Sequence, residues 1–398
     1  MTPSLSTRVQ RIKPSPTLSL TVRVNQLKAQ GHDIINLGVG EPDFDTPNYI
    51  KTAGIKAIES GATKYTAVDG ISSLKEAVIH KFKRENKLTY EPKQILISSG
   101  SKQALYNLAQ ALLDEGDEVI IPAPYWVSYP DIIFLAGGVP VFIPTTLEQH
   151  FKITPEQLEK AITPKTKLLI LNSPNNPTGM IYTHKELEGL AQVLLKHPHI
   201  FIASDDMYEH IQWSGSPFSN IVNACPALYE RSMVFNGVSK TYAMTGWRIG
   251  YCAGPQYLIH AMSNVQAQST SNANSMAQLA AVTALNGPQD FVAEMQRTYH
   301  KRHTRVFQAL QAIPGVKCLP SMGSFYIFPD FSDFLGKIPG IDHDLELADY
   351  LLMEAKVALI PGSAFGAPGC LRLSFVVEMN ILDEAMTRIR HALSKFSL

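Results

Sequence analysis

Charge imbalance and long apolar segments are both missing from this 398-residue sequence. Lysine plus arginine equal aspartate plus glutamate at 35 each, so the net charge is zero, and no long basic run is present. We therefore expect no nucleic-acid partner. No stretch is long enough to span a membrane, and the N-terminus lacks the apolar core of a signal peptide, so we expect no membrane partner.

Cysteine is scarce, and the four cysteines lie far apart in the sequence. They fit neither a CxxC metal pattern nor a disulfide framework. Their positions are Cys225, Cys252, Cys318 and Cys370. Reduced thiols in a cytoplasmic enzyme are the simplest interpretation, and we predict no metal site.

Apolar residues, in contrast, are abundant. They make up 45% of the chain, against 18% charged residues, which is typical of a well-packed soluble protein with a large core or a buried subunit interface. The chain is longer than one hydrophobic core usually supports, so we expect two domains.

Short apolar runs alternate with helical stretches through the first two thirds of the chain. The runs are 94–98, 118–121, 168–171, 200–203 and 233–235. The alternation predicts an α/β fold, with a mostly parallel sheet sandwiched by helices. A polar cluster follows each run. Ligands bind beyond the carboxyl ends of such strands, so we expect a site at that edge of the sheet.

The pattern changes after about residue 295. A short strand at 325–328 and a helix at 381–393 belong to what we predict is a smaller α/β domain. We predict a large domain of residues 48–295. A small domain of residues 1–47 and 296–398 would close over the site.

The helix that enters this smaller domain carries a basic face that includes His300, Arg302 and Arg305. His300 and His303 have a spacing that suits a metal, but their cationic neighbours argue against one. We expect a solvated face.

The N-terminal region contains two prolines and a glycine motif. Pro14 and Pro16 predict that residues 13–17 are not helical. A strand at 34–37 leads into Gly-Val-Gly-Glu-Pro-Asp-Phe, which resembles the start of a dinucleotide fingerprint. Asp43 replaces the third glycine, and Pro42 with two acids would repel a pyrophosphate, so a nicotinamide site is not favoured.

Lys240 follows directly after the apolar run at 233–235, and Arg248 comes eight residues later. Burial would lower the pKa of such a lysine and leave a more nucleophilic amine, which can condense with an aldehyde. Arg248 could grip an anion on the same ligand. The stretch alone is equally compatible with a surface lysine and an arginine in a salt bridge.

Three further features favour the first interpretation. Ser99-Gly-Ser-Lys102 precedes a helix, where free backbone N–H groups attract an anion. Asp205 ends a strand and needs a cationic partner, and Trp126 offers a flat face for stacking. A phosphate cradle, a carboxylate, an aromatic plate and a reactive lysine together describe a receptor for pyridoxal 5'-phosphate.

Five motifs resemble those of the class I aminotransferases, the fold-type I enzymes that use pyridoxal phosphate. They are Tyr-Trp-Val-Ser-Tyr, Asn-Ser-Pro-Asn-Asn-Pro-Thr-Gly, Ser-Asp-Asp-Met-Tyr-Glu-His, Ser-Lys-Thr-Tyr-Ala-Met-Thr-Gly-Trp-Arg and Gly-Glu-Pro-Asp-Phe-Asp-Thr-Pro. The resemblance runs from about residue 8 to the C-terminus. It is strongest to the bacterial aspartate aminotransferase branch, some members of which also use prephenate.

The resemblance implies a role for each matching residue. Lys240 corresponds to the catalytic lysine, which also binds the cofactor, and Asp205 to the partner of the pyridine nitrogen. Arg372 corresponds to the clamp on the substrate α-carboxylate, with Gly40 beside it. The other implied cofactor contacts are Tyr208 and Asn176 at the ring hydroxyl, Trp126 on the ring face, Gly100, Ser101, Lys102 and Arg248 at the phosphate, and Tyr65 from a second subunit.

The sequence departs from the family pattern at two positions. Asp206 stands where a glutamate is usual, which we expect to be harmless. Gly237 stands where a phosphate-binding serine is common, three residues before Lys240. The neighbouring Ser239 should point the other way on a strand, which puts that phosphate contact in doubt.

The resemblance implies ping-pong transfer of an amino group from an L-amino acid, with aspartate as the expected donor and 2-oxoglutarate as the acceptor, in a cytoplasmic homodimer with shared sites. A distal substrate carboxylate would need a further cation, for which Lys13 and Lys102 are the candidates. Alternatives are transfer from aromatic or other neutral amino acids, a β-lyase on the same fold, and a catalytically silent regulatory protein. The complete set of Lys240, Asp205 and Arg372 argues against the silent protein.

Overall fold

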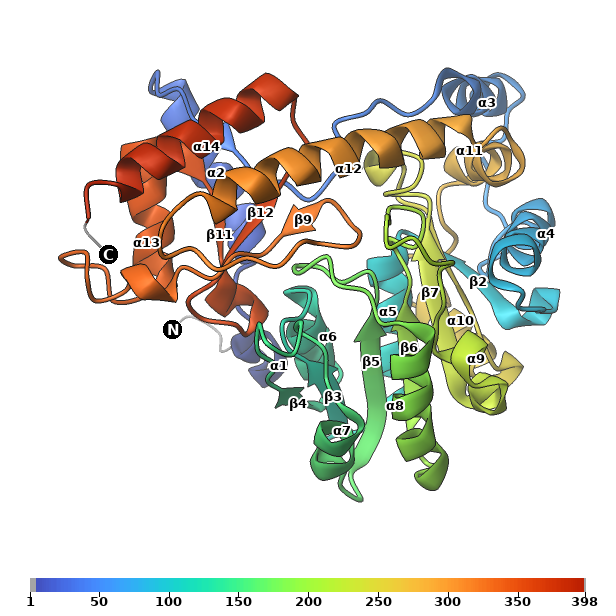
Figure 1. The fold of residues 1–398 in the computed structure, drawn as a ribbon. Helices are drawn as coiled ribbons and strands as arrows, with labels where there is room; N and C mark the ends of the chain where they lie inside the picture. Colours follow the sequence, from blue (N-terminus) through green and yellow to red (C-terminus); the bar gives the residue numbers. More distant parts are fainter. Residues whose placement is uncertain (1–4, 397–398) are drawn as a thin grey trace.

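A seven-stranded sheet forms the centre of the larger of two bodies in the computed structural model, which describes residues 5–396 (Figure 1). The strand order is β2-β8-β7-β6-β5-β3-β4, and β8 runs antiparallel to both of its neighbours. The strands are β2 (Ile95–Ser98), β3 (Glu118–Pro122), β4 (Val139–Ile143), β5 (Thr166–Asn172), β6 (Phe201–Asp205), β7 (Ser232–Gly237) and β8 (Gly250–Ala253). The predicted mostly parallel sheet is confirmed, with β4 and β8 added to it.

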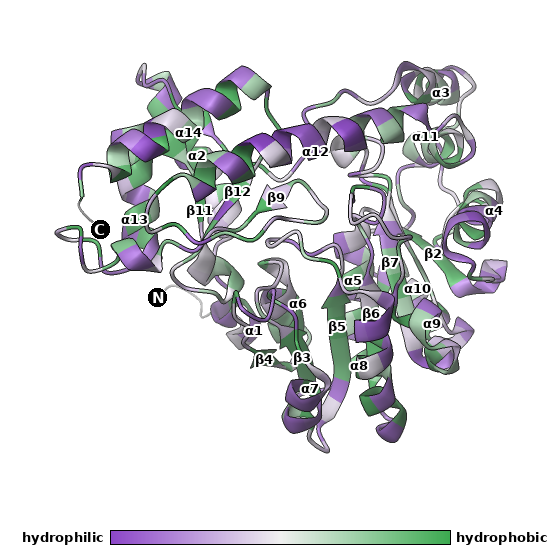
Figure 2. Ribbon diagram, in the orientation of Figure 1, coloured by the Kyte–Doolittle hydropathy of each residue, from purple (hydrophilic) through white to green (hydrophobic). Residues whose placement is uncertain are grey.

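Successive residues of each strand point into two different hydrophobic cores. Ile95 and Ile97 enter one core and Leu96 enters the other, because side chains alternate across a sheet. One face is covered by α3 (Asn48–Glu59), α4 (Ser72–Lys81), α7 (Pro155–Ala161), α8 (His184–Lys196), α9 (Ile221–Ala224) and α11 (Ser275–Asn286). The other face is covered by α5 (Ser101–Leu112), α6 (Ser128–Leu135) and α10 (Gln256–Ala267). Figure 2 shows the strands as predominantly hydrophobic. Both faces of the sheet are therefore buried, as continuous apolar runs require.

The second body contains two small sheets. In one, β1 (Ile35–Asn36) pairs in parallel with β10 (Val357–Ala358). The other has the order β11-β12-β9, from β11 (Ile360–Pro361), β12 (Leu371–Ser374) and β9 (Tyr326–Ile327). Its helices are α2 (Pro16–Ala29), α13 (Asp344–Tyr350) and α14 (Met379–Leu393). Two cores hold these elements together: one includes Leu347 and Ile389, and a smaller one includes Val24 of α2 and Ala358 of β10.

The long helix α12 (Asp290–Gln311) joins the two bodies, running from the side of α11 to the side of α14 (Figure 1). The predicted domain boundary at 295/296 falls within this helix, and the short helix α1 (Thr7–Arg11) contacts α6 of the larger body. The smaller α/β unit exists, while its exact boundaries stay a prediction. Among residues 5–396, no helix combines the length and apolar composition needed to cross a membrane.

Two local predictions are wrong. Residues 16 and 17 are helical, because Pro16 occupies the first position of α2, where its missing N–H costs nothing. In α12, Arg302 is buried and pairs with Asp43 at 2.9 Å, and His303 is buried too. That part of the face is not solvated.

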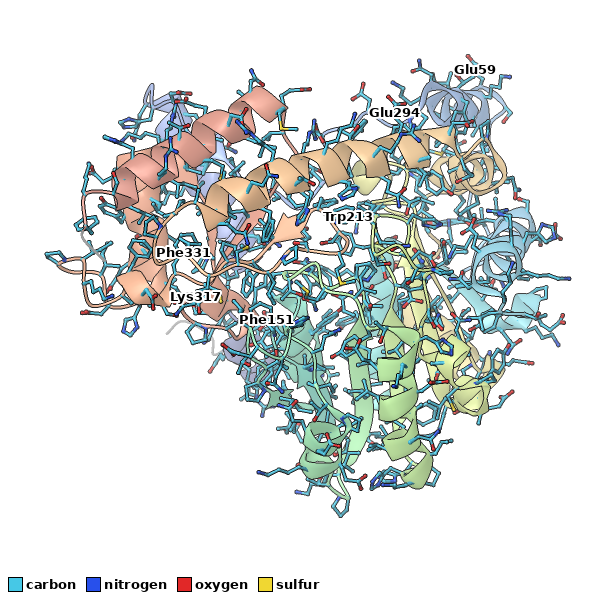
Figure 3. All side chains as sticks on the ribbon, in the orientation of Figure 1. Glu59, Phe151, Trp213, Glu294, Lys317 and Phe331 are labelled. Atoms are coloured by element: carbon cyan, nitrogen blue, oxygen red, sulfur yellow. The ribbon has the colours of Figure 1, made fainter. Side chains whose placement is uncertain are left out.

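Aromatic rings pack where α12 passes over the larger body. Trp213, labelled below α12 in Figure 3, stacks on His300 at 5.2 Å between ring centroids. Burial lowers the pKa of His303 to about 4. The histidines of α12 therefore belong to the packing between the bodies rather than to a metal site.

Candidate active site

A cavity of about 520 Å³ lies at the carboxyl ends of the central strands, where the two bodies meet. Ten of the residues singled out from the sequence line it. They are Gly40, Ser101, Lys102, Trp126, Asn176, Asp205, Tyr208, Lys240, Arg248 and Arg372. The larger body places Asn176 after β5, Asp205 at the end of β6, Lys240 after β7 and Ser101 at the start of α5. The segment after β1 and strand β12 supply Gly40 and Arg372 from the second body.

Lys240 reaches into this cavity from the turn after β7, and its Nζ donates a hydrogen bond to the Gly40 carbonyl oxygen. Burial lowers the pKa of Lys240 to about 8, and the nearby cations Arg372, Arg248 and Lys102 act in the same direction, against Glu41. A sizeable fraction of this side chain is a neutral amine near pH 8. Of the two interpretations of the sequence, the surface lysine is excluded.

Asp205 is buried at the end of β6. Its Oδ2 accepts a hydrogen bond of 2.6 Å from the Tyr129 hydroxyl, and its Oδ1 accepts one of 3.3 Å from the backbone of Met207. Burial raises the pKa of Asp205 to about 6, although these hydrogen bonds and Lys240 oppose the rise. A cation placed beside this carboxylate would hold it ionised.

Tyr129 was not identified from the sequence as a site residue. The sequence contained a signal, because Tyr129 belongs to the motif Tyr-Trp-Val-Ser-Tyr, three residues after Trp126. In the structure both side chains line the cavity. Their rings meet edge to face at 5.3 Å. Tyr129 lies on α6, so this helix orients Asp205 through a neutral donor.

Arg372 is almost completely buried, with 2% of its surface exposed. Its guanidinium donates to Asn176 Oδ1 at 2.9 Å and to the Gly38 carbonyl oxygen at 2.8 Å. It also stacks on Tyr326 at 4.3 Å. The Nε–H of Arg372 is buried without a hydrogen-bond partner in the described structure.

Tyr208 lies next to this arginine, and its hydroxyl is 3.2 Å from that of Tyr326. Burial raises the pKa of Tyr208, so it stays a neutral hydroxyl. Tyr326, which the sequence analysis did not single out, thus contacts both Arg372 and Tyr208. A β-carbon at Gly40 would come within 3.1 Å of the Tyr326 hydroxyl, so the backbone passes close to this group.

An anion site forms at the N-terminus of α5. Gly100 caps the helix with φ +84° and has no side chain to occupy the free N–H groups. Ser101 Oγ is buried without a hydrogen-bond partner among the described residues. Arg248 folds back over Gly100, where a β-carbon would lie 2.3 Å from its Nη2. Lys102 stands 4.9 Å from the centre of the Trp126 ring, and burial lowers its pKa.

The two departures from the family pattern have structural explanations. Strand β7 ends at Gly237, so Ser239 no longer follows the strand alternation and lines the cavity. The expectation that Ser239 points away is wrong. A β-carbon at Gly237 would lie 3.0 Å from the Ile249 carbonyl oxygen, which leaves no room for a serine without movement. Asp206 accepts hydrogen bonds from Ser204 and Asn220.

Three predicted site residues lie outside the cavity lining: Gly100, which caps α5 beside Ser101, and also Tyr65 and Lys13. Tyr65 is 91% exposed on the larger body. Lys13 is exposed near Asp131, whose pKa is raised by burial and lowered by contacts with Lys13 and Lys102. One chain alone therefore does not bring Tyr65 to the cavity, and the roles given to all these residues stay predictions.

Comparison with known proteins identifies the family. Residues 32–389 match the family "Aminotransferase class I and II", and the chain belongs to it. The chain is 56% identical over 395 residues to the aspartate/prephenate aminotransferase of Nitrosomonas europaea, covering 98% of this chain and 100% of that protein. It is 49% identical over 385 residues to the aspartate aminotransferase of Geobacillus stearothermophilus, covering 97% and 98%.

Solved structures agree with this assignment. The aspartate aminotransferase of Rhizobium meliloti superposes with a TM-score of 0.96 at 45% identity, covering 99% of this chain and 100% of that one. The enzyme of Thermus thermophilus with maleate superposes with a TM-score of 0.93 at 40% identity, covering 98% and 100%. The predicted α/β fold and the predicted aminotransferase family are confirmed.

Proposed function

We propose that this protein transfers the amino group of L-aspartate to 2-oxoglutarate with pyridoxal 5'-phosphate as cofactor, and that it also accepts prephenate as an amino acceptor. The observation that carries this proposal is the convergence of Lys240, Asp205 and Arg372 on one cavity. The names of the relatives support the choice of substrates.

The side chains of the cavity fit pyridoxal phosphate. Gly100, the unpartnered hydroxyl of Ser101 and the guanidinium of Arg248 provide donors for a phosphate at the N-terminus of α5. Asp205 is a buried carboxylate whose hydrogen-bond partners are neutral, and a protonated ring nitrogen would supply the missing cation. Lys102, Asn176 and Tyr208 would complete the set, with Trp126 against the ring.

The bound cofactor supplies a carbon that carries the amino group and a ring that accepts the electrons of the substrate Cα–H bond. Arg372 holds the α-carboxylate of the substrate, since its planar fork matches that group. Lys240 would bond to the cofactor and, once displaced by the substrate, would take the Cα proton, a role that its lowered pKa suits. Asp205 would hold a proton on the ring nitrogen.

We also propose that two chains share each site. Tyr65 projects from the larger body into solvent, as expected for a side chain that reaches the phosphate of a neighbouring subunit. Closure of the smaller body, together with residues 13–17, would then exclude water from the cavity. The four free cysteines support a reducing compartment, and we place the protein in the cytoplasm.

Complementation tests the shared site. Tyr65→Ala and Lys240→Ala chains are each expected to be inactive alone. Mixed dimers carry one site in which both residues are intact, so co-refolded chains should recover part of the wild-type activity. An active monomer in analytical ultracentrifugation would contradict the shared site.

Turnover of the purified protein on a panel of amino acids with 2-oxoglutarate tests the reaction. Aspartate should give glutamate without release of ammonia, which separates transamination from a β-lyase reaction. A preference for aromatic or other neutral donors would overturn the choice of aspartate. The variant Lys240→Ala should lose at least about 10³-fold in rate. Lys196→Ala, at an exposed lysine of α8, is the matched control.

A further inference from the structure

A second group of buried charged residues lies behind the loops that carry Tyr208 and Lys240. Lys81, the last residue of α4, is completely buried. Its ammonium contacts the carboxylate of Glu209, donates to Asn86 Oδ1 at 2.8 Å and lies 3.7 Å from Glu85 Oε2. A π-helical turn, η1 (Phe82–Asn86), follows α4 directly and carries Glu85 and Asn86. Such turns often accompany functional sites.

A metal ion is the first alternative for this group. Glu85, Glu209 and His210 each bring a ligand atom within 4.8 Å of the others. The Lys81 ammonium contacts the same two acids, so the chain supplies the cation itself. The group is better described as an ion cluster than as a metal site.

Glu209 is the centre of the cluster. Besides Lys81, its carboxylate accepts hydrogen bonds of 2.6 Å from Asn86 Nδ2 and of 2.6 Å from Asn236 Nδ2. Burial raises the pKa of Glu209, but Lys81 and His210 outweigh this and hold it below the ordinary value. A buried carboxylate that stays ionised with this many donors is fixed in one orientation.

The cluster reaches the cavity at two adjacent positions of the chain. His210 Nε2 lies 2.9 Å from Glu85 Oε2, and its Nδ1 lies 3.1 Å from the Thr241 hydroxyl. Thr241 is the residue after Lys240, and it is 1% exposed. Glu209 is the residue after Tyr208. Both catalytic loops are thus tied to the end of α4 through side chains that do not line the cavity.

We propose that Lys81, Glu85, Asn86, Glu209, His210 and Thr241 form a positioning cluster that holds Lys240 in its partly buried place beside Gly40. None of these six side chains lines the cavity, so they act through Lys240 and Tyr208 rather than on the substrate. The inference depends on the proposed role of Lys240.

The variant Thr241→Val tests the cluster, because it removes the hydroxyl that reaches His210 and keeps the shape of the side chain. A less constrained Lys240 nitrogen would be better solvated and would hold its proton more firmly. In the holoenzyme, the pH midpoint of the visible absorption change of the cofactor on Lys240 should rise by about half a pH unit or more. The kcat should fall about 5-fold to 50-fold, with KM for aspartate changed less than about twofold.

Two variants show whether the effect belongs to the hydroxyl. Thr241→Ser keeps the contact with His210 and should restore the wild-type midpoint. Thr166, at the end of β5 that lies away from the cavity, has an equally buried hydroxyl, which accepts a hydrogen bond from the Thr163 backbone. Thr166→Val removes this hydroxyl and should leave the pH midpoint of the cofactor absorption unchanged. If Thr241→Val lowers the thermal midpoint but titrates like wild type, the cluster is merely structural and the inference is wrong.

A double variant extends the test to the charges. Glu209→Gln together with Lys81→Met removes both members of the ion pair and avoids a lone buried charge. It should fold and still show the raised pH midpoint. An unchanged midpoint would overturn the inference. A wild-type protein that shows no visible cofactor absorption would instead refute the proposed function.

Discussion

Two sets of buried charges lie on opposite sides of the loops at 205–210 and 239–241. In the positioning cluster, Lys81 pairs directly with Glu209, and two asparagine side-chain amides donate the remaining hydrogen bonds to this carboxylate. In the cavity, Asp205 accepts from the neutral Tyr129, and Lys240 donates to a carbonyl oxygen. Arg372 also donates to neutral acceptors and keeps a free Nε–H.

The contrast separates charges that are satisfied by the chain from charges that require a ligand. An ion pair with complete hydrogen bonding holds its surroundings in place, whereas a buried charge with neutral partners costs free energy. Under the proposed function, a protonated ring nitrogen beside Asp205 and a substrate α-carboxylate beside Arg372 would offset this cost. Substitutions on the two sides of the loops should therefore change stability in opposite directions.

The largest effect is expected for Glu209→Gln, which removes the closer of the two carboxylates beside the buried Lys81 and leaves only Glu85, at 3.7 Å. We predict that the free energy of unfolding at pH 7 falls by about 3–5 kcal/mol. The pKa of Glu209 is lowered in the folded state, so its contribution is present above the unfolded value of 4.5 and is lost as the pH falls through the folded value. Urea denaturation at several pH values measures the difference, which should shrink in acid.

The matched control is Glu186→Gln, at a partly exposed ion pair with Lys152. It should cost less than about 1 kcal/mol, because exposed pairs are screened by water. Equal losses at the two positions would show that burial does not distinguish them.

For Asp205→Asn in the cofactor-free protein, we predict instead that the free energy of unfolding rises. The pKa of Asp205 is raised to about 6 in the folded state, against 3.8 when unfolded. Its contribution to stability is therefore full below pH 3.8 and is lost as the pH rises through 6. The variant should be more stable than wild type at pH 7.5 by about 1–3 kcal/mol, since a tenfold change in a protonation equilibrium corresponds to about 1.4 kcal/mol.

Adding pyridoxal phosphate should reverse this order. The cofactor stabilises the protein in proportion to its affinity, and the variant lacks the carboxylate that holds the ring nitrogen protonated. Denaturation with and without the cofactor measures both signs. A variant that is destabilised in the cofactor-free state would show that the Tyr129 hydrogen bond already compensates the charge.

Most of the charged residues of the cavity could be predicted from the sequence. Lys240, Asp205 and Ser101 each follow or end an apolar run, and parallel strands place their carboxyl ends at one edge. Arg372 and Gly40 come from the other body, and only the family resemblance indicated that they join the same site. Tyr326 was missed as a site residue because a tyrosine in the apolar stretch 325–328 looks like an ordinary core residue.

The positioning cluster could not be predicted in the same way. Lys81 ends an amphipathic helix, where a lysine is usually solvated, and its partner lies 128 residues further along the chain. The π-helical turn that brings Glu85 and Asn86 to the same point has no clear sequence signal. Arg302 illustrates the same limit, because its partner Asp43 comes from a distant loop. Long-range pairing of charges is set by tertiary packing.

The smallest effects concern the two lysines proposed to bind the distal carboxylate of aspartate. Lys102 lines the cavity and is partly desolvated, whereas Lys13 is exposed. We predict that Lys102→Ala lowers kcat/KM for aspartate. The loss should correspond to about 1–3 kcal/mol of transition-state stabilisation, the range for a hydrogen bond to a charged group. Lys13→Ala should cost less than about 1 kcal/mol, since water screens an exposed charge.

Steady-state kinetics with alanine as the donor provides the control, because alanine has no distal carboxylate. Its kcat/KM should change little in either variant if the lysines bind the side chain. Lys102 is also a proposed phosphate contact, so cofactor affinity is measured in parallel and turnover is assayed at saturating cofactor. Equal losses for aspartate and alanine would assign Lys102 to the cofactor alone. The distal carboxylate would then need a cation from the segment that closes over the cavity, and Lys13 would give the larger side-chain-specific effect.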